Sequence, residues 1–328
     1  MNTSKKAVLV LTQQRDSHAD LVIRELNRRG VPLIRFDTSD FPLRSTLVAY
    51  SQQGTWRVSL QFQQRAIEFD QIASVWYRRP TPFEFEPTLT PTGRQFANAE
   101  ARMAIGGLLR SMDCLWVNHP EKIVTADYKP LQLKLASACS LEIPRSLVTN
   151  NPDEAKDFFE HCKGEMIYKT LSGGMIASED GEVLSIYTNR ITADNLKDIQ
   201  RVKYTACLFQ EYVPKQIELR ITVIGSNVFA AEIHSQHSER SATDWRASYE
   251  DLRYAIHELP SEVRQKCLTL VRRCELAFAA IDMILTPDNR YVFLELNPNG
   301  QWGWIEHATG LPLCKTMADL LTANINVG

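Results

Sequence analysis

Short apolar runs and helical stretches alternate along the first 120 residues. Residues 7–11 form a continuous apolar run typical of a buried strand, residues 19–30 place apolar side chains at helical spacing, and residues 31–37 return to an apolar run. This βαβ pattern predicts an α/β lobe with a parallel sheet. We expect three further elements in the lobe, a strand, a helix and a short strand, at 74–80, 95–112 and 114–118.

Two regions of mixed helices and strands follow. In the first, Asn151, Pro152 and the acidic pair Asp153 and Glu154 are signals for the start of a helix. In the second, we expect an apolar hairpin that turns at 225–227, an amphipathic helix over about 261–279, two more strands and a closing helix. The sequence therefore predicts an α/β protein of three lobes, with bounds at 1–120, 121–205 and 206–328.

Composition narrows the class of protein. The chain of 328 residues is 44% hydrophobic and 23% charged, which is typical of a globular protein. Its formal net charge of −2 gives no electrostatic reason to expect nucleic-acid binding. The seven cysteines are scattered without a CxxC motif, and the first apolar run is too short for a signal sequence or a membrane span. We expect a cytoplasmic protein with reduced thiols and no membrane partner.

The apolar strand near the C-terminus carries polar side chains at alternate positions. In the stretch FLELNPNGQWGWIE, Glu295 and Asn297 are two residues apart, so they should point to one face of the strand. Leu294 and Leu296 should then point to the other face. A carboxylate and a carboxamide on one face of a hydrophobic strand suggest a polar site.

A second acidic residue is expected directly opposite Glu295. If the turn of this hairpin centres on Asp288 and Asn289, Asp282 lies across the ladder from Glu295. Opposed carboxylates in a partly buried sheet repel each other unless a cation lies between them or one is protonated. With Asn297 on the same face, the oxygen set suits Mg²⁺ or Mn²⁺. The alternative is a solvated acidic pair on an exposed face.

Two upstream segments have features of a nucleotide site. Lys169 lies near the end of a predicted strand and is followed by a small-residue loop, 172–174, whose free N–H groups suit polyphosphate. Further on, the backbone of residues 211–213 is a strand edge able to pair with adenine, and Glu218 is available to a ribose. Each feature alone has a simpler alternative, a turn in the first segment and a surface carboxylate in the second.

Together and in this order, these elements resemble the ATP-grasp ligases. The resemblance spans residues 120–328 and implies an ATP-grasp fold: an N-terminal pre-ATP-grasp α/β lobe, a small central α+β lobe and a C-terminal α+β lobe, with ATP between the last two. It implies a nucleotide site made of Lys129, Lys169, Ser172, Gly173, Gly174, Gln210, Glu211, Tyr212, Val213 and Glu218. It implies two Mg²⁺ ions, with Mn²⁺ as an alternative, on Asp282, Glu295 and Asn297, and catalytic roles for Arg220, Lys169 and Asn297. Lys134 is the alternative to Lys129 as the first lysine.

A narrower resemblance covers essentially the whole chain. The motifs VWYRRP, ELRITVIG, DWR at 244–246 and FLELNPNGQWGWIE resemble the ATP-grasp maturases of microviridin-type peptides, also called graspetides. Those enzymes activate Asp or Glu side chains of a ribosomal precursor peptide and join them to Thr or Ser hydroxyls or to Lys amines. The resemblance implies a precursor with a leader and a core as partner, leader recognition near residues 192–198, and allows a homodimer.

Other candidate residues surround this site. Arg78 and Arg79 are adjacent on a strand, so at most one of them should face an acidic core peptide. Trp302 and Trp304 either line a peptide groove or cover a core edge. His234 and His237 have no cysteine beside them, and we do not expect them to bind zinc.

The chemistry implied is carboxylate activation. Phosphoryl transfer from ATP gives an acyl phosphate, and a hydroxyl or an amine then displaces phosphate. The loop at 172–174 would close over the intermediate to exclude water. Two alternatives remain: an ATP-grasp ligase that adds an amino acid to a small molecule or a protein C-terminus, and a non-catalytic ATP-binding regulator. The full set of acids and lysines argues against the regulator.

Overall fold

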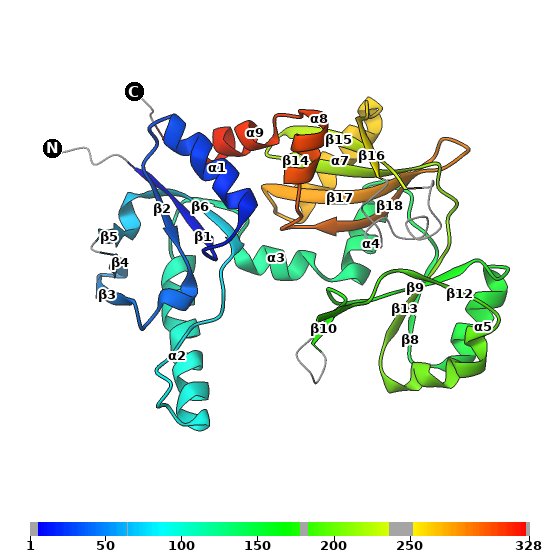
Figure 1. Cartoon of the computed structure of the whole chain (residues 1–328), viewed down its shortest axis with the longest axis horizontal. Coiled ribbons are helices and arrows are strands. Elements are labelled where there is room, and N and C mark those ends of the chain that lie inside the picture. The colour runs from blue at the N-terminus through cyan, green and yellow to red at the C-terminus, as the bar shows by residue number, and fades with distance from the viewer. Residues whose placement is uncertain (1–5, 64, 178–182, 236–251, 326–328) are drawn as a thin grey trace.

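The protein consists of three lobes, and the computed structural model describes residues 6–63, 65–177, 183–235 and 252–325. Figure 1 shows the N-terminal lobe on the left, the C-terminal lobe at the upper right and the central lobe below it. Helix α3 (Pro120–Ala126) runs from the N-terminal lobe towards the other two. This arrangement confirms the α/β class predicted from the sequence.

The N-terminal lobe is built on a four-stranded parallel sheet, as the βαβ pattern predicted. The strand order is β2-β1-β6-β7, and every neighbouring pair is parallel. All six residues of β1 are buried, which accounts for its continuous apolar run. The elements of this sheet and its helices are β1 (Ala7–Thr12), α1 (Ser17–Arg28), β2 (Leu33–Phe36), β6 (Ile72–Arg79), α2 (Pro91–Arg110) and β7 (Leu115–Val117).

A three-stranded antiparallel sheet lies between β2 and β6 in the sequence, where we predicted no element. Val58, Leu60 and Ile67 bury their side chains in the core of the N-terminal lobe. The neighbours of Val58 and Leu60 along their strand are polar, so the alternation is visible in the sequence once the strands are known. The elements are η1 (Thr38–Asp40), β3 (Ser45–Gln52), β4 (Thr55–Phe62), β5 (Arg65–Glu68) and η2 (Phe69–Gln71).

The central lobe is a four-stranded antiparallel sheet covered by α5 and η3. Its order is β12-β9-β13-β8, so β13 completes this sheet although it follows the predicted boundary at 205. The Asn151 side chain accepts a hydrogen bond from the Asp153 N–H and caps α5, as the sequence indicated. The elements are β8 (Ser146–Thr149), α5 (Pro152–His161), β9 (Met166–Lys169), β10 (Met175–Ala177), β11 (Val183–Ser185), β12 (Asn189–Ile191), η3 (Asn195–Tyr204) and β13 (Cys207–Glu211).

The C-terminal lobe contains a five-stranded antiparallel sheet of order β16-β15-β14-β17-β18. The predicted hairpin turn is confirmed, because Gly225 separates β14 from β15 and has a φ of 59°. The predicted long helix is shorter than expected: it ends at Arg273, and residues 278–279 already belong to β17. The elements are α4 (Lys129–Ala138), β14 (Ile217–Ile224), β15 (Asn227–His234), β16 (Arg253–Ile256), α7 (Ser261–Arg273), β17 (Phe278–Leu285), β18 (Tyr291–Asn297), α8 (Gly303–Thr309) and α9 (Leu313–Leu321).

The N-terminal and C-terminal lobes share one hydrophobic core. Val8 and Trp76 of the parallel sheet pack in the same cluster as Phe278 of β17 and Trp302. Helix α9 contributes Met317 to this cluster, and Figure 1 shows α9 beside α1 at the junction of the two lobes. A common core fixes the parallel sheet against the strands that carry the predicted metal site.

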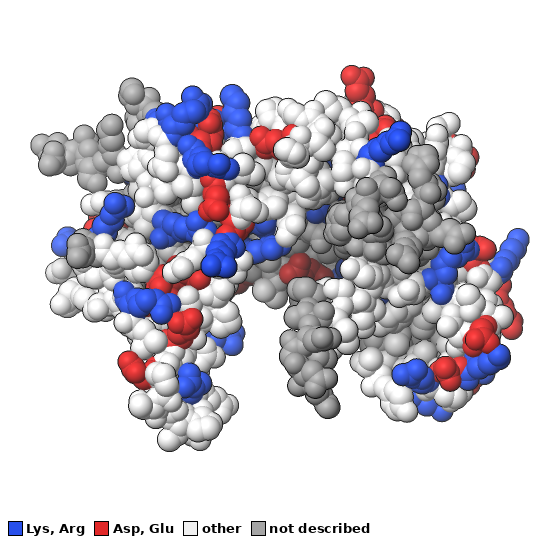
Figure 2. Space-filling model, viewed as in Figure 1, with Lys and Arg blue, Asp and Glu red and all other residues white. Residues whose placement is uncertain are grey.

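Charges of both signs are interspersed on the face shown in Figure 2, in keeping with the net charge of −2. In the described ranges, none of the helices combines the length and the apolar character needed to cross a bilayer.

Candidate active site

The predicted acidic pair lies on two neighbouring strands of the C-terminal sheet. Asp282 on β17 is directly opposite Glu295 on β18, which confirms the predicted register at this position. Asn297 is on the same face, and its Nδ2 donates a 3.2 Å hydrogen bond to Asp282 Oδ2. Both acidic residues are largely buried, Asp282 being 6% and Glu295 4% exposed. The alternative of a solvated acidic pair is therefore wrong.

A β-bulge produces this register. Near the turn, Leu285 pairs with Tyr291, so the hairpin is centred on Asp288 and not between Asp288 and Asn289 as predicted. The register then shifts between Asp282 and Met283, which leaves Leu294 without an opposite residue and restores the pairing of Asp282 with Glu295. Because of the bulge, Leu294 and Glu295 both face the nucleotide side, and the prediction that Leu294 points away is wrong. Leu296 does point away, into the hydrophobic core.

Two basic side chains neutralise the opposed carboxylates. Lys129 Nζ lies 2.8 Å from Glu295 Oε2, and Arg220 Nη1 lies 2.6 Å from Asp282 Oδ1. Arg220 is opposite Asp282 on β14, and its Nη2 also donates to the Gln301 carbonyl. Protein cations therefore offset the repulsion between the two acids in the absence of metal. This arrangement supports Lys129, at the start of α4, over Lys134 as the first lysine of the site.

The second predicted lysine and the glycine loop lie in front of this acidic face. Lys169 at the end of β9, the residues of the 172–174 loop, Glu295 and Asn297 line one cavity of about 300 Å³. Gly174 has a φ of +70°, and a Cβ at this position would lie 2.7 Å from the Ile186 carbonyl oxygen. Only glycine fits this turn without strain, so the loop backbone can approach a phosphate chain.

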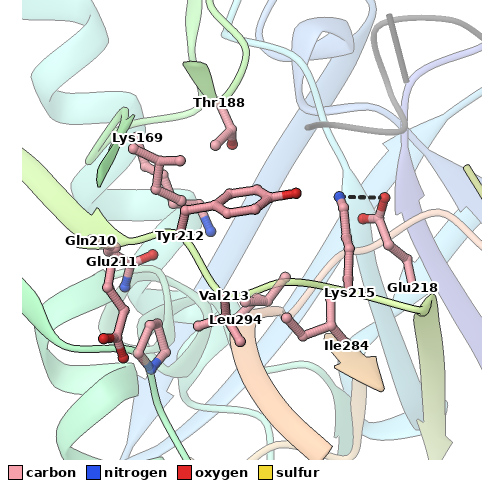
Figure 3. Close-up of a pocket in the computed structure, with 12 residues that line it drawn as sticks. Lys169, Thr188, Gln210, Glu211, Tyr212, Val213, Lys215, Glu218, Ile284 and Leu294 are labelled. Atoms are coloured by element: carbon pink, nitrogen blue, oxygen red, sulfur yellow. Dashed lines mark hydrogen bonds and ion pairs between the residues drawn. The ribbon is translucent and has the colours of Figure 1, made fainter. Parts of the chain in front are cut away.

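A second pocket, between the central and C-terminal sheets, adjoins the first. Ile167, Val213, Ile284 and Leu294 provide its apolar surface, and Figure 3 shows the last three gathered at one side of the pocket. Lys169 lines both this pocket and the cavity of about 300 Å³, so the two are neighbours; we call the latter the phosphate-sized cavity. We call the second pocket the apolar slot; apolar surface beside a polar cavity suits the base and the phosphates of a nucleotide.

The predicted adenine segment is engaged in part by the protein itself. Glu211 N–H donates to the Arg145 carbonyl and Tyr212 N–H donates to the Glu165 carbonyl. Glu211 also binds Arg145 through its carboxylate, at 2.6 Å from Nε. Gln210 is buried, and its Oε1 has no hydrogen-bond partner among the described residues. An unpaired buried acceptor beside the apolar slot is a position for the exocyclic amine of adenine.

Glu218 is buried at the far end of the slot and belongs to the site, so the alternative of a surface residue is wrong. Its Oε1 lies 2.7 Å from Lys215 Nζ and accepts a 2.6 Å hydrogen bond from Ser235 Oγ. Figure 3 shows the Lys215–Glu218 pair closing this side of the pocket. These two contacts fix the position of the carboxylate, and its role in binding a ribose stays a prediction.

We expect Glu218→Gln to weaken ATP binding by about tenfold, because a hydrogen bond to a charged group contributes about 1.5–3 kcal/mol. Isothermal titration with a non-hydrolysable ATP analogue measures the effect. Glu232→Gln is the matched control, since Glu232 lies on the adjacent strand β15 and binds His234 and His257 away from the pocket. Equal affinities in the Glu218 variant and the control would contradict the ribose assignment.

A third cavity, of about 460 Å³, opens on the other side of Asn297. It is lined by Arg79, Asp127, Arg220, Tyr254, Asn297, Pro298, Asn299, Gly300, Gln301 and Trp304. Since Asn297 also lines the phosphate-sized cavity, the two spaces meet at this side chain. Asn297 is therefore within reach of groups bound in either cavity.

The adjacent arginines of β6 have different environments, as the strand alternation predicted. Arg78 is buried, lies 3.6 Å from Asp16 Oδ2 and donates to the Asn299 carbonyl, and burial lowers its pKa to about 10. Arg79 lines the third cavity and contacts the Gln301 side chain. Arg79 is therefore the one available to an acidic peptide.

Both tryptophans pack against the core that the N-terminal and C-terminal lobes share, and Trp304 also lines the third cavity. Trp302 is 1% exposed and packs in the core shared by the N-terminal and C-terminal lobes. Trp304 lines the third cavity and packs against Tyr254, with ring centroids 4.9 Å apart. Trp302 therefore covers a core edge, and a peptide groove lined by Trp304 stays a prediction.

His18 anchors the segment that follows strand β18. Its Nε2 accepts hydrogen bonds from the N–H groups of Trp302 and Gly303, at 3.1 and 2.8 Å. Burial and, to a lesser degree, the Arg78 guanidinium lower the pKa of His18 to about 4 from 6.5. The imidazole therefore stays neutral and keeps its acceptor at neutral pH.

We expect the free energy of unfolding to fall as the pH is lowered from about 6.5 to about 4. In this window the unfolded chain binds the proton of His18 more strongly than the folded chain, and the lost stability amounts to about 3 kcal/mol. Denaturant titrations at several pH values measure it, with His18→Gln as the comparison because an amide oxygen accepts without titrating. Parallel pH profiles for the two proteins would contradict the assignment.

Several site residues were not found from the sequence. Ile167 and Ile284 lie two residues from Lys169 and Asp282 on the same strand faces, so strand alternation could have identified them. Lys215 and Asp127 gave no such signal, because both lie between the predicted elements and line cavities that only the folded chain forms. Residues 192–194 precede the 3₁₀ helix η3, and their predicted contact with a leader stays a prediction. His237 and the DWR motif at 244–246 lie outside the described residues.

Comparison with known proteins identifies the family. Residues 7–124 match the MvdD pre-ATP-grasp domain, and residues 126–321 match the RimK-like ATP-grasp domain. The chain belongs to the RimK-like ATP-grasp ligase family. The predicted ATP-grasp fold and the family resemblance are confirmed, and the junction between the two matched regions lies close to the predicted bound at 120.

Two solved structures with similar sequences are enzymes determined in complex with peptides. The RiPP-associated ATP-grasp ligase of Chryseobacterium gregarium, in complex with ADP and a leader and core peptide, is 32% identical, with 97% of each chain covered and a TM-score of 0.90. The macrocyclase MdnC of Microcystis aeruginosa MRC, bound with the precursor peptide MdnA, is 30% identical, with 97% of this chain and 100% of that chain covered and a TM-score of 0.85. A probable α-L-glutamate ligase of Shewanella halifaxensis (strain HAW-EB4) is 26% identical over 215 residues, and the chain spans only 44% of its length.

The side chains of this ATP-grasp ligase fit the ligands that the family uses, ATP and Mg²⁺. The unpaired Gln210 acceptor and the apolar slot suit adenine, and Lys129 and Lys169 suit phosphates. Asp282, Glu295 and Asn297 offer carboxylate and amide oxygens, which are the ligands that Mg²⁺ prefers. When bound there, the metal would neutralise phosphate charge.

Proposed function

We propose that this ATP-grasp ligase macrocyclises a ribosomally made precursor peptide of the microviridin type. It would phosphorylate Asp or Glu side chains of the peptide and join them to Thr or Ser hydroxyls as esters, or to Lys amines as amides. The observation that carries the proposal is the meeting of two cavities at Asn297, one suited to a triphosphate and the other open and lined by Arg79 and Trp304. The similarity to peptide macrocyclases over nearly the whole chain supports the same function.

The charges around Asn297 suggest how the first step proceeds. A peptide carboxylate in the third cavity would bind Arg79 and Arg220 and face the terminal phosphate. Lys129 and Lys169 would offset the charge that develops on the phosphates, while Asp282 and Glu295 would hold one or two Mg²⁺ ions or, as an alternative, Mn²⁺. Catalysis then consists of positioning and charge neutralisation, with Arg220, Lys169 and Asn297 closest to the transferred group.

Gln210, Val213 and Glu218 would hold the base and the sugar of ATP. Gln210 Oε1 would accept from the adenine amine, and Val213 would supply the backbone edge, because the N–H groups of Glu211 and Tyr212 are already engaged. Glu218 would bind the ribose. The loop of Ser172, Gly173 and Gly174 would cover the phosphates and keep water from the acyl phosphate.

The partner and the setting follow from the same proposal. The precursor would carry a leader that docks near residues 192–198 of the central lobe and a core with acidic, hydroxyl or amine side chains. We place the reaction in the cytoplasm and keep the homodimer as a prediction. Neither nucleic acid nor membrane is needed by this chemistry.

Mass spectrometry of precursor peptides tests the proposal. The protein is incubated with ATP, Mg²⁺ and a panel of peptides that includes MdnA, and the products are then treated with mild base. Each ring removes one water from the peptide mass; rings that base opens are esters, and rings that survive are amides. Unchanged peptide masses across the panel, with ATP bound, would overturn the proposal.

The relation to the probable α-L-glutamate ligase favours one alternative, the addition of an amino acid to a small molecule or a protein C-terminus. ATP hydrolysis that depends on a free amino acid and not on a peptide would support that alternative. A regulator that only binds ATP would not hydrolyse it in the presence of either a free amino acid or a peptide.

A further inference from the structure

Asp127 connects the two cavities that meet at Asn297. It is the residue that ends helix α3, and it lines the third cavity. Two residues later, Lys129 begins α4 and lines the phosphate-sized cavity. The short segment between α3 and α4 therefore spans the boundary where phosphate and peptide would meet, with its acidic residue on the peptide side.

The Asp127 carboxylate differs from the other acids around the site. Asp282, Glu295 and Glu218 are each held by a lysine or an arginine. Asp127 makes no hydrogen bond or ion pair through its side chain with any residue in the described part of the chain, and it is the only carboxylate among the described residues of the third cavity. Its charge is therefore available to a bound ligand.

The same cavity also offers an available cation. Arg79 forms no ion pair with a described residue and contacts only the side-chain oxygen of Gln301. The available cation in this cavity can stabilise negative charge on the oxygens of an acyl group. The available anion can accept the proton that a nucleophile must lose. Both the acyl group and the nucleophile are present when a ring closes.

We propose that Asp127 is a catalytic residue that accepts the proton of the attacking hydroxyl or amine in the second half of the reaction. This inference rests on the proposed function. The nucleophile forms a bond to the acyl carbon, the bond between that carbon and the phosphate oxygen breaks, and inorganic phosphate leaves with the electron pair. The proton of the nucleophile passes to the Asp127 carboxylate and from there to solvent at the cavity mouth.

The surroundings of Asp127 suit this role. Burial of part of the carboxyl raises its pKa above the usual value, and Lys129 on the neighbouring helix partly opposes this shift. The other charged or titratable groups that face the cavity are Arg79, Arg220 and Tyr254. A carboxylate with a raised pKa is a stronger base than an ordinary aspartate.

The test separates phosphorylation from ring closure by trapping the acyl phosphate with hydroxylamine. Hydroxylamine attacks as a neutral amine and does not need a protein base, so hydroxamate reports the first half-reaction. With MdnA and related precursor peptides, ATP and Mg²⁺, we expect Asp127→Asn to slow ring formation on the order of 100-fold while hydroxamate forms at nearly the wild-type rate. Asp127→Glu should recover part of the ring formation, because it restores the base.

Glu121→Gln is the matched control, because Glu121 is in α3, the helix that Asp127 follows, is paired with Arg110 and does not line the cavity. It should form rings and hydroxamate at wild-type rates. Rings formed by Asp127→Asn at the wild-type rate would overturn the inference and leave the proposed function intact. Loss of hydroxamate together with rings in this variant would also overturn it, since Asp127 would then act in the first half. A wild-type protein that forms neither product would overturn the proposed function and this inference with it.

Discussion

Glu295→Gln should abolish ATP-dependent turnover and leave the fold intact. The substitution removes one anionic ligand from the proposed metal site, and loss of such charge stabilisation lowers the rate by roughly 1,000-fold or more. The fold should survive because Gln keeps the size of the side chain, and Lys129, the lysine that pairs with Glu295, is 19% exposed and reaches the open cavity. Precursor-dependent ADP release measures turnover, and thermal unfolding measures stability.

Relief of the repulsion between Asp282 and Glu295 is not the reason that we expect the fold of Glu295→Gln to survive. From the sequence we expected two opposed acids that repel each other without metal, but Lys129 and Arg220 already compensate them. For the same reason Asp282→Asn is a poorer test, because it leaves Arg220 buried without its acid, which costs about 3–5 kcal/mol. Glu295 is thus the acid whose removal separates activity from stability.

Asp288→Asn is the matched control for Glu295→Gln. Asp288 lies in the turn of the same hairpin, its side chain is 63% exposed, and it pairs with Arg290 away from both cavities. Its substitution should change neither turnover nor Mg²⁺ dependence. Wild-type turnover in Glu295→Gln, or an equal loss in the control, would exclude the metal assignment.

The elements of the fold were predictable where a buried strand or an amphipathic helix leaves a pattern in the sequence. Residues 7–11, the hairpin turn at Gly225 and the cap at Asn151 are local features, and each was found. The opposed pair Asp282–Glu295 was also found, although for an incomplete reason. The bulge at Leu294 is set by packing of Phe293 and Leu296 on one face and of Leu294 on the other, and such a choice is not visible in a hairpin sequence.

Contacts between distant segments account for what the sequence did not show. The third cavity brings Arg79 of the N-terminal lobe beside Tyr254 of β16 and Trp304 near the C-terminus. The neutral His18 that anchors Trp302 lies 284 residues before it. No local pattern predicts which of two neighbouring arginines or two tryptophans faces a cavity, because burial of the other depends on the core shared by two lobes.

The segment after β18 shows how closely this shared core approaches the chemistry. Gly300 lies against the centre of β17: a Cβ on this residue would be 2.4 Å from Ala280 Cβ, 2.8 Å from Arg220 Nη2 and 3.2 Å from Asn297 Cβ. Such distances require the backbone or the guanidinium to move. Gly300→Ala should therefore displace Arg220 from Asp282 and from the Gln301 carbonyl.

We expect Gly300→Ala to lower turnover by about 100-fold or more, because small displacements of a charged group near the reacting atoms are costly. The free energy of unfolding should fall by only about 1–3 kcal/mol. Gly107→Ala is the matched control: Gly107 lies in α2, a Cβ added to it would meet no atom within 4 Å, and it shares with Gly300 a backbone outside the left-handed region. The control should gain up to about 1 kcal/mol from better helix propensity without a change in turnover. Wild-type turnover in Gly300→Ala would mean that the segment relaxes away from β17, and that Arg220 does not depend on it for its position.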